Sequence, residues 1–104
     1  MIETYADLHK LVEENMDSFM ANNPDELLEF GIAENASCSI TYPKNGNKML
    51  FMLAKFGHEY KVGFAFFEEG EKAPDWMDDI FNHEFNGKFI NTLIEEHLLK
   101  DSPF

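Results

Sequence analysis

The chain contains no arginine and no glutamine, and its positive charge comes from eight lysines set against twenty acidic residues. Arginine is the side chain whose planar fork binds phosphates and carboxylates through two parallel hydrogen bonds. Its absence and the net charge of −12 argue against a nucleic-acid reader, a kinase and a nucleotide-binding protein. Because the same potential repels anionic lipid, we expect neither nucleic acid nor a membrane as a partner.

Cysteine and long apolar runs are also scarce. Cys38 is the single cysteine, so no internal disulfide can form, which fits a reducing compartment. No run of eighteen apolar residues occurs, and the first residues, MIETYADLHKLVEEN, carry acids where a secretory signal carries basic residues. We therefore expect a cytoplasmic location.

The sequence also lacks the spacings of known catalytic and metal sites. It has no His-x-x-x-His, no Cys-x-x-Cys, no phosphate-binding glycine loop and no EF-hand pattern. The negative surroundings of Cys38 raise a thiol pKa, so we interpret this residue as a small buried hydrophobe. An enzyme would have to gather His58 or His83 with carboxylates in one pocket. We predict no enzymatic activity, no cofactor and no metal.

Hydrophobic residues make up 44% of the chain and include eleven phenylalanines, enough for the core of a single domain spanning residues 1–104. Apolar residues at steps of three and four predict helices, alternation predicts strands, and Asn45-Gly46 and Gly57-His58 predict the turns between them. The expected elements are a helix over 3–21, a short helix over 24–31, strands over 37–43, 48–56 and 60–68, and helical structure over 74–100. The predicted fold is α+β: N-terminal helices, a three-stranded antiparallel meander and C-terminal helices packed on the sheet.

One stretch, EEGEKAPDWMDD, concentrates acids around the only tryptophan. Tryptophan is enriched where binding energy concentrates, and acids around it would steer a basic surface toward it. The simpler interpretation is that Trp76 belongs to the core and the acids begin a helix. We take as candidate partner-binding residues Glu68, Glu69, Glu71, Asp75, Trp76, Asp78 and Asp79.

In size, charge and lack of catalytic motifs the chain resembles the small acidic immunity proteins of bacterial toxin–immunity pairs. This resemblance implies a basic toxin or nuclease as the partner and inhibition as the role. It rests on overall character and carries no residue roles with it.

Two alternatives remain open. The stretch GIAENASCSITYPKNGNKMLFML is similar to the first strands of type III secretion chaperones, which are acidic α+β homodimers that bind unfolded segments of effectors. Such a dimer would use an exposed edge of the sheet and the apolar face of the first helix. DNA-mimic inhibitors from phage share the charge. The sequence leaves open whether the chain is a monomer or a homodimer.

Overall fold

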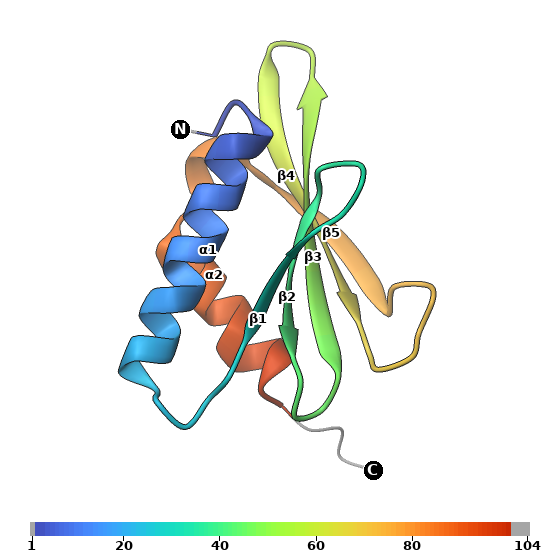
Figure 1. Cartoon of the computed structure of the whole chain (residues 1–104). Helices are drawn as coiled ribbons and strands as arrows, with labels where there is room; N and C mark the ends of the chain where they lie inside the picture. The colour runs from blue at the N-terminus through green and yellow to red at the C-terminus, as the bar shows by residue number, and fades with distance from the viewer. Residues whose placement is uncertain (1, 101–104) are drawn as a thin grey trace.

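The computed structural model of the chain describes residues 2–100 as one N-terminal helix, a five-stranded antiparallel sheet and a short C-terminal helix (Figure 1). Helix α1 spans Tyr5–Asn22 and helix α2 spans Gly87–Leu93. A turn of 3₁₀ helix, Asn82–Glu84, precedes α2, and a turn of π helix, Ile94–Leu98, follows it. The strands are β1 (Glu29–Ile32), β2 (Cys38–Tyr42), β3 (Asn47–Phe56), β4 (Glu59–Phe67) and β5 (Trp76–Phe81).

The strand order in the sheet is the order in the chain, β1-β2-β3-β4-β5. The three strands predicted from alternation correspond to β2, β3 and β4, with ends that differ by one residue. The β3–β4 connection is a two-residue turn with positive φ at Gly57, as the Gly-first turn of a hairpin requires. The prediction of a three-stranded sheet was wrong, because the sheet gains a strand at each edge.

The first added strand replaces the predicted short helix over 24–31. Pro24 and Asp25 lie in a turn, and the chain then extends into β1, where Phe30 pairs with Ile40 of β2. A helix over 24–31 would have only about two turns, and a helix that short is barely stable unless it packs against other elements. Pairing with β2 satisfies the backbone groups of this segment instead.

The second added strand replaces the first part of the helical structure predicted over 74–100. Residues Trp76–Phe81 form β5, which pairs with β4 from Phe66↔Trp76 to Lys61↔Phe81. Helical structure begins only at Asn82, and Asn86 then caps α2 by accepting a hydrogen bond from Phe89 N at 2.9 Å.

Helix α1 follows its prediction closely. Thr4 accepts from Asp7 N at 3.1 Å, and the Asp7 carboxylate accepts from Thr4 N at 3.2 Å, which forms a capping box. One side of α1 is buried against the sheet through Leu8, Val12, Met16 and Phe19.

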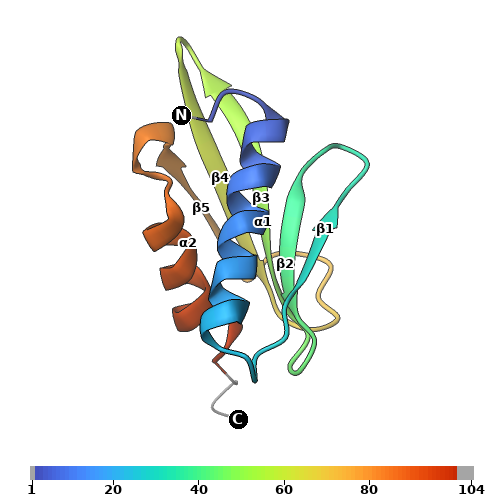
Figure 2. The same ribbon diagram turned by 60° about the vertical axis from the view of Figure 1, so that its left-hand side comes forward.

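Both helices lie over the same face of the sheet, side by side (Figure 2). Side chains alternate along β3, so Met49 and Phe51 are fully buried beneath the helices while Leu50 and Met52 point to the other face and are half-buried. The sheet thus has one face inside the core and one face that no element within residues 2–100 covers. We call the second the open face.

Candidate protein-binding surface

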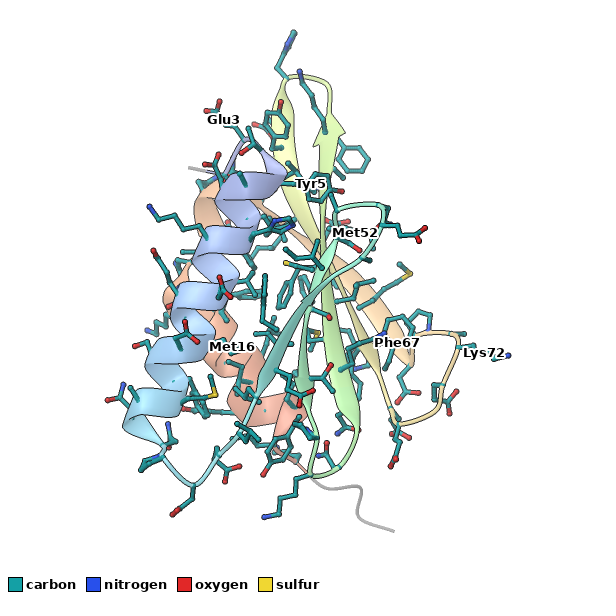
Figure 3. The ribbon with its side chains drawn as sticks, in the orientation of Figure 1. Glu3, Tyr5, Met16, Met52, Phe67 and Lys72 are labelled. Carbon is teal, nitrogen blue, oxygen red and sulfur yellow. The ribbon has the colours of Figure 1, made fainter. Side chains whose placement is uncertain are left out.

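Residues 68–75, which connect β4 to β5 and which we call the acidic loop, hold four of the candidate acids. Glu71 N donates to Glu68 O at 3.2 Å, and Gly70 has a φ of 77°, which closes a tight turn at the tip. Asp75 N donates to Phe66 O at 2.8 Å, so the loop re-enters the sheet there. Figure 3 places Lys72 at the outer end of this loop, where it points away from the sheet.

The loop brings three carboxylates close together. One carboxylate oxygen from each of Glu68, Glu71 and Asp75 lies within 4.8 Å of the others, and all three residues are exposed. The charge of Asp75, and then a hydrogen bond with its carboxyl group, raise the pKa of Glu68 above its ordinary value. The ion pairs formed within residues 2–100, Lys61–Asp79 and His83–Glu84, include none of these acids. The cluster therefore attracts cations from outside.

Glu69 lies apart from this cluster, against the turn between β2 and β3. A Cβ atom placed on Gly46 would come within 2.6 Å of the Glu69 side chain, so the two are in close contact. Gly46 has a φ of 77° and ends a four-residue turn that the Asn-Gly pair predicted. The four acids of the loop therefore lie in two places: Glu68, Glu71 and Asp75 form the cluster, and Glu69 lies beside the β2–β3 turn.

Asp78 and Asp79 project to opposite faces because β5 is a strand. Asp78 lies opposite Phe64 and Asp79 opposite Gly63, and both aspartates are exposed. Asp79 forms an ion pair with Lys61 at 3.1 Å on the open face. Because residues 76–81 form a strand and not the predicted helix, Asp75 and Asp79 are not one helical turn apart.

Trp76 is half-buried and packs against aromatic rings on the helix side of the sheet. Its ring stacks on Phe66 at 5.9 Å, meets Phe64 edge-on at 5.9 Å and meets His97 edge-on at 4.8 Å. Such contacts hold β5 against the C-terminal helical segment. The position favours a structural role for Trp76, with a part of its surface left accessible beside Asp75.

The open face carries exposed hydrophobic residues that sequence reasoning did not single out. Met77 is 65% exposed, Phe56 is 59% exposed and Phe81 is 38% exposed. The prediction of helical structure over 74–100 missed Met77 and Phe81, because WMDDIF spaces its apolar residues as a helix does and does not alternate between apolar and polar.

The histidines considered for catalysis do come together. His58 and His83 line a cavity of about 330 Å³ with Glu3 and Glu59, next to the turn between β3 and β4. His83 is exposed, stacks on Phe81 and lies 3.7 Å from a carboxylate oxygen of Glu84. Because His83 is exposed, water solvates its ring.

Cys38 is fully buried on β2, and burial raises the pKa of its thiol to about 12. A thiol with that pKa is almost entirely protonated near neutral pH and is a poor nucleophile. The structure thus agrees with the interpretation of Cys38 as a small core residue.

Over residues 2–100, no helix combines the length and the apolar character that crossing a bilayer requires. Comparison with known proteins gave no match to a protein-family model, to a curated protein or to a solved structure.

Proposed function

We propose that this chain is a binding protein for a basic protein, which it meets through the acidic loop and the adjoining strand β5. The observation that carries the proposal is the cluster of carboxylates from Glu68, Glu71 and Asp75. The remaining candidate contacts are Glu69, Trp76, Asp78 and Asp79.

The carboxylate cluster is a source of binding free energy because its members repel one another. The raised pKa of Glu68 reflects this repulsion. A lysine or arginine of a partner placed among the three carboxylates would replace repulsion by attraction. Since the acids are solvent-exposed in the free chain, their charge also acts at long range and speeds the encounter with a basic surface.

Within this class we propose the role of an immunity-type inhibitor that acts in the cytoplasm on a basic toxin or nuclease. The support is the resemblance in size and charge, together with a net charge of −12 on a chain of 104 residues. A phage-type inhibitor that mimics DNA would use the same carboxylates. A secretion-type chaperone is the other alternative, but the apolar side of α1 is buried against the sheet, so a dimer would need a different surface.

The binding proposal is tested with a synthetic peptide rich in lysine and arginine, by calorimetric titration at low and at physiological salt. One variant neutralises the cluster: Glu68→Gln, Glu71→Gln and Asp75→Asn. A matched control makes the same change in net charge on the exposed side of α1, with Glu13→Gln, Glu14→Gln and Asp17→Asn.

We expect the loop variant to bind at least about tenfold more weakly, since local charge pairs contribute more than distant ones. The control should lose less than about threefold, because its charges are distant and screened. Equal losses in the two variants would mean that only total charge matters, and the proposed site would then be wrong.

The inhibitor role has its own test. The chain is co-expressed with a basic nuclease or toxin found among the neighbouring genes of its source genome, and cell growth is followed. Wild type and the α1 control should restore growth, and the loop variant should not. Absence of rescue by wild type would remove the inhibitor role while leaving the binding measurement intact.

A further inference from the structure

The open face of the sheet carries a row of apolar residues near the acidic loop, flanked by Lys48 at one end and by Lys61 and Asp79 at the other. The register aligns Leu50 of β3 with Ala65 of β4 and Met77 of β5 across the sheet. Phe67 adjoins this row at the end of β4, on the side of the sheet away from the helices (Figure 3). An apolar sheet face left in water loses the stabilisation that burial would give it.

The middle strand of the open face has small side chains, and larger neighbours already cover part of it, since Ala65 is buried. Gly63 and Ala65 lie in succession along this side of β4, and the Met52 side chain leans over Gly63, 3.0 Å from where a Cβ atom would be. The larger side chains of Leu50 and Met77 stand on the two neighbouring strands. Leu50, which is half-buried, and Met77, which is exposed, are therefore the side chains of this row that a partner can still cover.

Aromatic rings on the open face already bind ammonium groups. The Lys48 amine lies 4.9 Å from the ring centre of Phe67, and the Lys61 amine lies 4.5 Å from that of Phe81 and 5.5 Å from that of Phe56. The chain's own lysines therefore occupy these rings, which leaves the carboxylates of the acidic loop for the cations of a partner.

We propose that the open face is the second half of the binding surface and that it receives an amphipathic basic segment of the partner protein. The inference rests on the proposed function and specifies the chemistry of the partner. Apolar side chains of that segment cover Leu50 and Met77, while its lysines or arginines reach the acidic loop, since Asp79 is already paired with Lys61.

Charge selects a basic partner over a second copy of this chain. A symmetric dimer through the open face would bring together two chains that each carry a net charge of −12. The acidic loops border this face, so they would add like charge at the rim of such a dimer. A basic segment gains from the same loops, because its cations meet the carboxylate cluster as its apolar side is buried.

The test uses two synthetic helical peptides of equal length and charge. One contains lysine and leucine with every leucine on one side of the helix, and the other has serine in place of leucine. Binding is measured by calorimetric titration, and the contact surface is mapped from backbone amide chemical shifts in the full chain.

The variant is Met77→Ser with Phe81→Ser, and the matched control is Leu27→Ser. Leu27 and Met77 are both 65% exposed, but Leu27 lies before β1 and outside the open face. Thermal unfolding of each variant confirms that it is folded.

We expect the lysine–leucine peptide to shift the amides of β3, β4 and β5, and to bind at least about tenfold more tightly than the lysine–serine peptide. The Met77/Phe81 variant should lose most of that tenfold preference, and Leu27→Ser should keep it.

Each other result overturns the inference in a recognisable way. The two peptides could bind with equal affinity while the Glu68/Glu71/Asp75 changes still weaken binding. The open face would then not be part of the binding surface, and the proposed function would be unaffected. If neither peptide bound, both the role of the open face and the proposed function would be wrong. A dimer in sedimentation that the Met77/Phe81 variant dissociates would show that a second copy occupies this face.

Discussion

Asn82, which directly follows β5, holds the segment ahead of α1 against the sheet. Its side chain is buried, accepts a hydrogen bond from Ile2 N at 2.8 Å and donates one to Ile2 O at 2.5 Å. Both backbone groups of Ile2 are thus satisfied by one amide at the end of β5. The contact keeps the buried Ile2 side chain in the core ahead of α1.

We predict that Asn82→Ala lowers the free energy of unfolding by about 2–3 kcal/mol, because it leaves two buried backbone groups without partners. Urea unfolding measures the change. Asn91→Ala, at an exposed position of α2, serves as the control and should change stability by less than about 0.5 kcal/mol. A loss at position 82 no greater than the control would show that Ile2 is not held by this amide.

At the scale of single residues, the sequence predicted which side chains are exposed to solvent, but not which residues they contact. The loop acids are exposed because charge is costly to bury, and Cys38 is buried because an alternating strand pattern places it inside. Asn82 gave no such signal, because its partner lies eighty residues away in sequence. The clustering of Glu68, Glu71 and Asp75 likewise depends on how the loop turns, which net charge does not specify.

At the scale of elements, the turn between β1 and β2 contains a strained residue. Ala36 has a φ of 73°, a left-handed conformation that costs a side chain roughly 1–2 kcal/mol. The turn is held by Ala36 N donating to Ala33 O at 2.9 Å and by a 2.6 Å hydrogen bond between His9 Nε2 and Ala36 O.

We predict that Ala36→Gly stabilises the chain by about 0.5–1 kcal/mol, since relief of strain exceeds the added entropy of the unfolded state. The same substitution in the last turn of α1, Ala21→Gly, should destabilise by about 0.5–1 kcal/mol. Urea midpoints of the two variants should therefore move in opposite directions. A parallel decrease would mean that position 36 tolerates its side chain without strain.

The two missed strands share one physical cause. Local signals in residues 24–31 and 76–81 suit a helix, with proline and acids at its start and apolar residues at steps of three and four. Each segment instead lies at an edge of the sheet, where pairing with β2 or β4 satisfies its backbone. Aromatic residues such as Trp76 and Phe81 favour strands, so β propensity also supported this outcome. The inner strands β2, β3 and β4 were predicted to within one residue, because each is a run of strand-forming residues bounded by turn signals.

At the scale of the whole molecule, stability should depend on pH through carboxylates with opposite shifts. The pKa of Glu68 is raised above 4.5 by Asp75, so the folded state binds that proton more tightly than the unfolded state. Its contribution to stability is present below 4.5 and is lost as pH rises through the raised pKa. The pKa of Asp7 is lowered from 3.8 by hydrogen bonds from Glu3 N and Thr4, so its contribution is present above 3.8 and lost at lower pH.

We predict that Glu68→Gln raises the free energy of unfolding at pH 7 and that this gain shrinks as pH falls toward 4.5. Asp7→Asn should lower it at pH 7, and that loss should shrink as pH falls below 3.8. Urea unfolding across the acidic range, repeated in high salt, measures both. Salt should diminish the Glu68 effect, which arises from exposed charges. A pH-independent difference for Glu68→Gln would argue against repulsion within the cluster.

Because consecutive strands are neighbours in the sheet, each one can pair with its predecessor as soon as it leaves the ribosome. The helical layer is different, since α1 precedes the strands in the chain and α2, which packs beside it, follows them. During synthesis the helix side of the sheet is therefore only partly covered until α2 has been made. A nascent chain stalled before Asn82 would lack both α2 and the amide that fixes the N-terminal segment, and it would depend on chaperones to remain unaggregated.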